Sequence, residues 1–461
     1  MMKLGRVIGG ALSRGFLTVV VFAAPALAGE NVLLVVLDDV GVDRVAAYGA
    51  LENPPATPTM DGLADRGVRF DRCWSTPFCS PTRATLITGR YGFRTGIGVP
   101  LREGEKGLSV EEWSLPRTLN AATKSAYFTA AIGKWHLAGS AAAVEHPRRM
   151  GFEHYAGCPN NLRTPNDRKA YFSWTKVVDG KAAPAEGYLT TDTTDDALRA
   201  IAAAGERPWL VYLAYHAAHT PIHRPPEHLF TRELKGTALT EEAEFHKAMV
   251  EAIDHELGRL LKTLDPEVLA RTTVIVVGDN GTQGTANEPP WDKRRGKGTL
   301  FEGGVRVPLI VAGAGVSEAA RGTVCQAPVN TTDLWLSTLE LCGADAPAVL
   351  PAGWEHDSIS FLPLLEDPSA PHARDFLFTE HFVPNHPGAD YEHRNAALRV
   401  GDHKLVRNLL DGTDRLYDLS RSPLEKGNLL RDGTVPEGVR AVYADLQARL
   451  EALLPEGDSG E

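Results

Sequence analysis

The sequence predicts an α/β fold with a large central, mostly parallel sheet flanked by helices, followed by a smaller C-terminal α+β subdomain built on a short antiparallel sheet. Two observations predict this fold class. Up to about residue 345, continuous apolar runs that are typical of strands buried on both faces alternate with helical patterns. Beyond that position, short strand-like segments are joined by a turn sequence and followed by one amphipathic helix.

Three apolar runs predict central strands, at residues 31–37, 209–215 and 273–277. Each run leads directly into polar side chains: a pair of carboxylates, two histidines, and an Asp-Asn pair. Because ligands of open α/β sheets bind beyond the carboxyl ends of the strands, we expect these groups to converge on one rim. The residues expected there are Asp38, Asp39, His219, Asp279 and Asn280.

Helical patterns separate these runs, at residues 192–204 and 241–264. In the C-terminal part, residues 396–406 and 415–419 predict antiparallel strands joined by the turn Asp411-Gly412, and residues 436–454 predict an amphipathic helix. The expected organisation is therefore a main domain at residues 29–345 and a C-terminal subdomain at residues 346–461.

The N-terminus has the pattern of a signal peptide. Three basic residues precede an apolar run at residues 16–24, and Ala26-Leu27-Ala28 is typical of a cleavage site. The run is far shorter than the ~20 residues that a membrane span needs. We therefore predict a signal peptide at residues 1–28, export to the periplasm or the medium, and no stable membrane insertion after its removal.

Charge and cysteine content narrow the class of protein. Removal of residues 1–28 takes away three basic and no acidic residues, so the net charge falls from −11 to −14, which disfavours nucleic acid as a partner. Five cysteines are too few for a disulfide scaffold. Cys325 and Cys342 are one candidate pair for a bridge, although connectivity cannot be read from the sequence.

The stretch Thr76–Gly89 predicts a helix that begins at a thiol. Cys79 or Ser80 can act as the cap, Pro81 suits the first turn, and Gly89 can end the helix. A group at position 79 would then face free backbone N–H groups, where anions bind, with Arg83 about one turn further on. The alternative interpretation is a buried cysteine beside an ordinary helix cap.

The order Cys79-Ser80-Pro81-Thr82-Arg83, followed by Leu86-Ile87-Thr88-Gly89, resembles the signature of the sulfatase family, part of the alkaline phosphatase superfamily. The resemblance implies that a maturation enzyme oxidises Cys79 to formylglycine, whose hydrated aldehyde is the nucleophile. Phe78 is bulkier than the residue expected before the cysteine. The resemblance extends over the C-terminal region as well.

A metal site is the second expectation. Asp38, Asp39, Asp279 and Asn280 offer only oxygen ligands, which suit Ca²⁺ or Mg²⁺ and not zinc. The resemblance implies one divalent ion, commonly calcium, held by these four residues together with an oxygen of modified Cys79. Taken alone, adjacent carboxylates at a strand end more often cap a helix or face solvent.

Three further segments carry candidate catalytic residues. Residues 132–137 resemble a second sulfatase signature, with Lys134 and His136 pointing the same way if extended geometry continues. The family pattern His-x-Pro selects His219 over its neighbours His216 and His223. The glycine-rich loop 296–304 resembles the segment that carries a catalytic lysine, here Lys297.

The implied activity is hydrolysis of an aryl sulfate or a sulfated carbohydrate. Arg83, Lys134, Lys297 and the ion would neutralise the sulfate, and the ion would activate a diol hydroxyl on residue 79. The resemblance assigns protonation of the leaving oxygen to His219 or Lys297, and the proton uptake that releases sulfate to His136.

Two other functions stay open: a phosphodiesterase or phosphonate monoester hydrolase of the same superfamily, and a catalytically silent binder of sulfated glycans. Two segments are candidates for the border of the pocket. Residues 163–176 mix cations and aromatics, and a plain surface hairpin is the alternative. Residues 381–394 are rich in His, Pro and Asn.

Overall fold

The computed structural model describes residues 31–139, 141–162, 168–430 and 434–455. The predicted signal peptide at residues 1–28 lies outside this part of the chain. In the described part, no helix combines the length and the apolar character needed to cross a bilayer.

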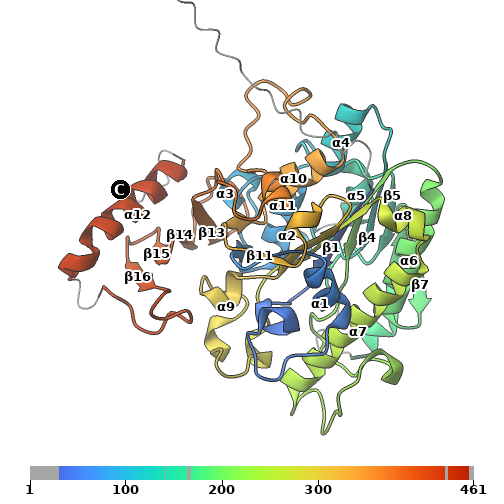
Figure 1. Cartoon of the computed structure of the whole chain (residues 1–461), viewed down its shortest axis with the longest axis horizontal. Coiled ribbons are helices and arrows are strands. Elements are labelled where there is room, and N and C mark those ends of the chain that lie inside the picture. Colours follow the sequence, from blue (N-terminus) through green and yellow to red (C-terminus); the bar gives the residue numbers. More distant parts are fainter. Residues whose placement is uncertain (1–30, 140, 163–167, 431–433, 456–461) are drawn as a thin grey trace, which may run out of the picture.

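A ten-stranded sheet forms the centre of the molecule (Figure 1). Five neighbouring strands in its middle run parallel. Antiparallel pairs extend the sheet on both sides, and a parallel pair, β2 and β11, ends it on the side of β10. In spatial order the strands are β11 (Thr323–Cys325), β2 (Gly67–Phe70), β10 (Leu309–Gly313), β9 (Thr272–Gly278), β1 (Asn31–Leu37), β8 (Trp209–Ala214), β4 (Phe128–Gly133), β5 (His154–Gly157), β6 (Ser173–Val178) and β7 (Lys181–Glu186). The predicted fold class is confirmed.

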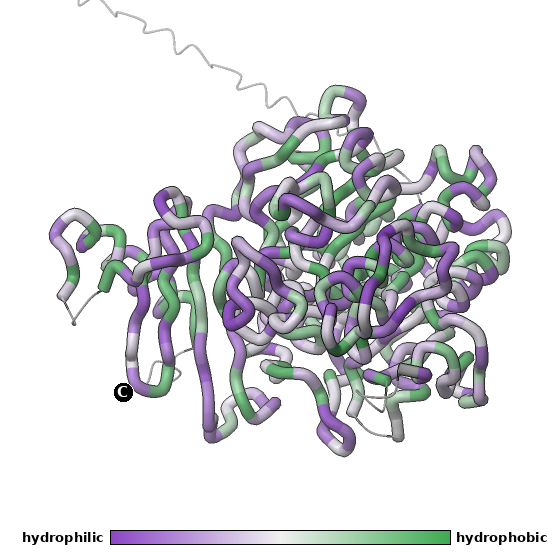
Figure 2. The backbone as a smooth tube through the Cα atoms, turned by 90° about the horizontal axis from the view of Figure 1, so that it is seen from below, coloured by the Kyte–Doolittle hydropathy of each residue, from purple (hydrophilic) through white to green (hydrophobic). Residues whose placement is uncertain are grey.

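Strand β1 shows why its apolar run is continuous. Val32, Leu34 and Val36 point into one hydrophobic core, while Leu33, Val35 and Leu37 point into the core on the opposite face. The first core is closed by α2 (Cys79–Thr88), α4 (Leu115–Thr123), α10 (Asp333–Leu341) and α11 (Leu362–Glu366). The second is closed by α1 (Pro58–Asp65), α6 (Leu189–Ala204) and α7 (Glu242–Thr263). Figure 2 shows hydrophobic segments concentrated within this layered body.

A separate antiparallel sheet lies to one side of the main body, at the left of Figure 1. It consists of β13 (Phe376–Val383), β14 (His393–Val400), β15 (His403–Asn408) and β16 (Asp414–Asp418) and packs against α12 (Arg440–Leu453). The prediction of one strand over residues 396–406 is wrong. The chain turns back at Gly401, whose φ of 57° suits glycine, so this run forms parts of two strands.

A buried ionic cluster joins this sheet to the main body. The Lys404 Nζ lies 3.1 Å from Glu302 Oε1 and 2.7 Å from Glu425 Oε1, and 4.4 Å above the ring of Trp74. The Glu302 N–H, at the start of α9 (Glu302–Val305), donates to Glu425 Oε2 over 2.7 Å. Lys404 of the C-terminal sheet thus compensates the charges of Glu302, which begins α9, and of Glu425.

All five cysteines are free, so the candidate bridge between Cys325 and Cys342 is wrong. Cys325 instead directs its Sγ to the carbonyl of Pro368, 3.4 Å away. Both thiols are buried, which explains how they serve as small apolar core residues.

Candidate active site

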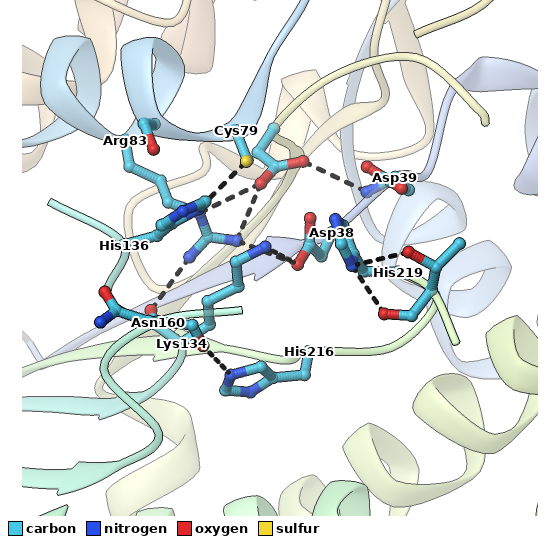
Figure 3. A network of polar contacts seen from close by, with 12 residues as sticks. Asp38, Asp39, Cys79, Arg83, Lys134, His136, Asn160, His216 and His219 are labelled. Carbon is cyan, nitrogen blue, oxygen red and sulfur yellow. Dashed lines mark hydrogen bonds and ion pairs between the residues drawn. The ribbon is translucent and has the colours of Figure 1, made fainter. Parts of the chain in front are cut away.

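The predicted polar residues meet where β1, β4, β8 and β9 end and where α2 begins (Figure 3). Asp38 and Asp39 follow β1, and Asp279 and Asn280 follow β9 in parallel register with it. His219 follows β8, Lys134 and His136 follow β4, Cys79 and Arg83 belong to α2, and Lys297 comes from the loop before α9.

Cys79 is the first residue of α2 and is only 1% exposed. Its Sγ lies 3.2 Å from His136 Nδ1. Phe78, not Cys79 or Ser80, occupies the cap position and provides no side-chain bond to the helix. The side chain of Cys79 is therefore not engaged in capping, and Gly89, with φ of 67°, ends the helix as predicted.

Three buried oxygens in the site have no hydrogen-bond partner: Asp38 Oδ1, Asp39 Oδ2 and Asn280 Oδ1. Because a buried acceptor without a partner is costly, this arrangement fits a bound cation. Hard oxygen donors of this kind suit Ca²⁺ or Mg²⁺. One ligand atom each of Asp38, Asp39 and His219 also lie within 4.8 Å of one another, so the structure brings His219 to the same place as the oxygens.

Three cations surround these carboxylates. The Arg83 guanidinium donates through Nε and Nη2 to Asp279 Oδ2, over 3.1 and 2.8 Å, and through Nη1 to the Lys134 carbonyl over 3.0 Å. Lys134 forms an ion pair with Asp38, and Lys297 Nζ lies 2.6 Å from Asp39 Oδ1. The positive groups thus converge from three different elements on one small volume, which suits a sulfate or phosphate group.

Burial and these charges set the protonation states. Burial opposes ionisation of Asp38, but the positive charges of Lys134, Arg83 and Lys297 together outweigh it and hold the pKa of Asp38 well below its usual range. Burial also opposes the charge of Lys297, but the carboxylate of Asp39 raises the pKa of that lysine. For Asp279, burial and the neighbouring charge of Asp38 raise the pKa, as expected where carboxylates gather at a cation site.

The two candidate catalytic histidines are neutral at pH 7. Burial, reinforced by the charges of Lys134 and Arg83, lowers the pKa of His136 well below its usual value. Burial and the charge of Lys297 lower the pKa of His219 to about 4. A neutral His136 beside position 79 can accept a proton there.

The backbone conformation of residues 133–136, which carries Lys134 and His136, differs from the predicted one. The expectation of continued extended geometry is wrong, because β4 ends at Gly133, with φ of 91°, and His136 has φ of 57°. Both side chains nevertheless reach the site: Lys134 contacts Asp38, and His136 contacts Cys79.

Tyr171 is one of the aromatic residues in the segment 163–176 that we expected at the border of the pocket. Its hydroxyl lies 2.7 Å from the carbonyls of both His216 and His219, so it fixes the loop after β8. It belongs to the segment 163–176, whose described part thus borders the site; residues 163–167 lie outside the described residues. His223 stacks on the Tyr171 ring at 4.1 Å, which gives this histidine a structural role.

Comparison with known proteins identifies the family. A family model described as Sulfatase matches residues 30–344. This chain belongs to the sulfatase family. The N-acetylgalactosamine-6-sulfatase of Canis lupus familiaris is 31% identical over 360 residues, which cover 71% of this chain and 65% of the relative. The chain thus spans less than two thirds of the length of that sulfatase.

Two other proteins match more of the chain. Human arylsulfatase A is 28% identical over 93% of this chain and 90% of its own length. A crystal structure described as Ps i-CgsB in complex with k-i-k-neocarrahexaose superposes with a TM-score of 0.76, at 24% identity, over 94% of this chain and 93% of that one. That likeness shows the common fold of the sulfatases.

Proposed function

We propose that this protein is an exported sulfatase that hydrolyses sulfate esters of carbohydrates through a formylglycine made from Cys79. The observation that carries the proposal is the surroundings of Cys79. Cys79 is the first residue of a helix, and its Sγ lies 3.2 Å from His136 Nδ1. The same site contains buried oxygens without hydrogen-bond partners and three converging cations. Relatives named for N-acetylgalactosamine-6-sulfate and for ulvan support a carbohydrate substrate.

In this proposal, Asp38, Asp39, Asp279 and Asn280 hold one divalent ion, Ca²⁺ or Mg²⁺, together with modified Cys79. When bound, that ion supplies positive charge for the sulfate group and for the nucleophile on residue 79. Asp38, Asp39 and Asn280 each carry one of the unpartnered oxygens described above.

The side chains of the chain itself would divide the remaining work. Arg83, Lys134 and Lys297 bind and orient the sulfate oxygens, since each is a donor held in place by a carboxylate. His136 accepts a proton from residue 79. Lys297 donates a proton to the departing oxygen, because the carboxylate of Asp39 keeps its ammonium group charged; His219, the other candidate, is neutral and would first have to take up a proton.

The first test is the mass of the peptide that contains Cys79, in protein from its native host, together with hydrolysis of 4-nitrophenyl sulfate. Conversion of the thiol to the aldehyde lowers the mass by about 18 Da and creates the reactive group. We expect the aldehyde to be present and Cys79→Ala to abolish turnover. An unmodified thiol in native material would remove the mechanism and leave a silent glycan-binding protein.

A parallel assay with a phosphodiester and a phosphonate monoester separates the second enzymatic function. The cations described above also suit phosphate oxygens, so some hydrolysis of these esters is compatible with the site. A kcat/KM for phosphodiesters above that for sulfate esters would contradict the proposal and favour the phosphodiesterase alternative.

A further inference from the structure

A cavity of about 430 Å³ lies between the loop that carries Lys297 and the C-terminal sheet. The loop contributes Gly298, Thr299, Leu300 and Phe301, and the sheet contributes residues that include His381, His393 and Tyr417. Its volume is within the range of about 300–1,000 Å³ that small-molecule sites occupy. The mechanism above uses none of the side chains that line it.

The cavity adjoins the opening of the active site. Lys297, 11% exposed, is directly followed by Gly298, which is part of the cavity wall. On the other side, the ring of Phe78, next to Cys79 in the chain, lies 6.1 Å from that of His381. A Cβ on Gly298 would come within 3.2 Å of the Phe78 ring, so glycine allows the loop backbone to approach that ring closely. The cavity therefore lies next to both segments that carry Lys297 and Cys79.

One wall of the cavity offers polar groups that converge on a point. Asn395 Nδ2 lies 2.6 Å from His393 Nε2 and 3.3 Å from His381 Nε2, and the two histidine nitrogens lie 3.3 Å apart. The three side chains belong to β13 and β14, so a rigid sheet holds them. Burial, with a further contribution from His393, lowers the pKa of His381 to about 4, so this histidine offers a neutral hydrogen-bonding group.

Other residues that line the cavity are apolar or aromatic. Leu300 and Val406 lie beside Phe301 and Tyr417, whose rings are 6.0 Å apart in an edge-to-face arrangement. Among the residues that line the cavity, the charges of Arg415 and Asp411 cancel. Apolar and aromatic side chains beside hydrogen-bonding groups suit a pyranose ring, which has C–H faces and a hydroxyl edge, and the opposite charges of Arg415 and Asp411 disfavour a second sulfate.

We propose that this cavity is a subsite for an unsulfated sugar unit next to the sulfated one, so that the enzyme acts on sulfated oligosaccharide or polysaccharide chains in preference to single sulfated sugars. This inference rests on the proposed hydrolysis of sulfate esters at residue 79. It adds that the C-terminal sheet, through His381, His393 and Asn395, selects the substrate.

The test compares three kinds of substrate with the matured protein: 4-nitrophenyl sulfate, sulfated galactose and N-acetylgalactosamine, and sulfated oligosaccharides that contain these sugars, carrageenan hexasaccharides among them. The variants are His393→Ala, which truncates an exposed side chain, and Asn395→Ala. His403→Ala is the matched control, because His403 belongs to the same sheet and does not line the cavity. The melting temperature of each variant checks its fold.

We expect the wild-type protein to prefer an oligosaccharide over its sulfated monosaccharide by at least about tenfold in kcat/KM. Both cavity variants should lose about tenfold on the oligosaccharide and change by less than about twofold on the aryl sulfate, since that substrate does not reach the subsite. The control should behave as wild type. Equal efficiency on monosaccharide and oligosaccharide, no turnover of any oligosaccharide despite aryl sulfatase activity, or equal losses on all substrates would each overturn the subsite.

Binding to the inactive Cys79→Ala protein separates this inference from the proposed function. Calorimetry with the same oligosaccharides should show binding that weakens about tenfold when His393→Ala is added. If this weakening occurs while no sulfate ester is cleaved by aldehyde-bearing wild-type protein, the subsite stands and the proposed hydrolysis fails. Absence of oligosaccharide binding to the Cys79→Ala protein overturns the subsite whatever the aryl sulfatase activity.

Discussion

Arg83 shows how a single side chain can hold the site together. It is completely buried, it belongs to α2, and it contacts both Asp279 after β9 and the Lys134 carbonyl after β4. Its planar guanidinium donates three hydrogen bonds to these two groups at once, which a lysine ammonium cannot reproduce.

We therefore predict that Arg83→Lys lowers kcat/KM for 4-nitrophenyl sulfate by about 10²–10³-fold, the usual effect of removing a preorganised donor. Arg90→Lys, just beyond the same helix, is the matched control, because Arg90 pairs with Glu112 away from the site. Steady-state kinetics and a thermal melt check the prediction. Equal activity of Arg83→Lys and Arg90→Lys would contradict a role for the guanidinium geometry.

At the level of single residues, local sequence was a good guide where a strand end or a helix start determines position. Asp38, Asp279 and Cys79 lie directly after or at such boundaries. Tyr171 could not be predicted in its role, because its hydroxyl bonds carbonyls 45 and 48 residues away. Lys134 and His136 were selected by resemblance, while their backbone conformation depends on packing that the sequence pattern does not express.

Helix α1 depends on a residue of another helix. Asp254 of α7 accepts hydrogen bonds from the N–H groups of Thr59 and Met60, in the first turn of α1, over 2.9 and 2.8 Å. These N–H groups have no partner within α1, so α7 caps α1 across the hydrophobic core.

This contact predicts a pH dependence of stability. Burial raises the pKa of Asp254 from 3.8 to about 6, so the folded state binds its proton more tightly than the unfolded state. The stabilisation from this proton is fully present below pH 3.8 and is lost as the pH rises through about 6. Urea unfolding from pH 4 to 7 should show wild-type stability falling relative to Asp254→Asn. Asp265→Asn, at an exposed helix cap, should keep the wild-type slope.

The ionic cluster at the C-terminal sheet gives a second prediction for elements. Lys404→Met leaves Glu302 and Glu425 buried without their shared cation, and should destabilise the protein by about 3 kcal/mol. Because Glu302 begins α9 just after the loop that carries Lys297, kcat should fall as well. Adding Glu425→Gln should recover part of the stability in urea unfolding. No recovery in the double variant would contradict charge compensation as the cause.

Elements were predictable to different degrees. Long apolar runs produced β1, β8 and β9 at the expected positions, and the patterns for α6 and α7 match within a few residues. Short strands such as β2, with four residues, carry too little periodicity to be recognised. Strand β2 acquires its geometry by pairing with β10 and β11. The boundary of the predicted domains at residue 345 stays a prediction.

For the whole molecule, the proposed cation site joins the ends of two strands that are about 240 residues apart in sequence. We predict that EDTA abolishes activity and lowers the melting temperature by several degrees. The melting temperature should fall because a ligand that binds only the folded state stabilises that state. Ca²⁺ or Mg²⁺ should restore the protein, and Zn²⁺ should not. Metal analysis by mass spectrometry should find one ion per chain, and Asn280→Ala should bind it less tightly. A metal-free protein that melts like the untreated one would contradict the site.

The depth of Cys79 has a consequence for the order of events during synthesis. Cys79 is 1% exposed and α2 is enclosed by the core. A second enzyme therefore cannot bind the chain around this thiol once folding is complete. If Cys79 is oxidised to formylglycine as proposed, the oxidation must therefore precede the folding of residues 76–89 into their place in the core. Unmodified protein that has already folded should resist a maturation enzyme that converts the isolated peptide, and conversion of both at equal rates would refute this timing.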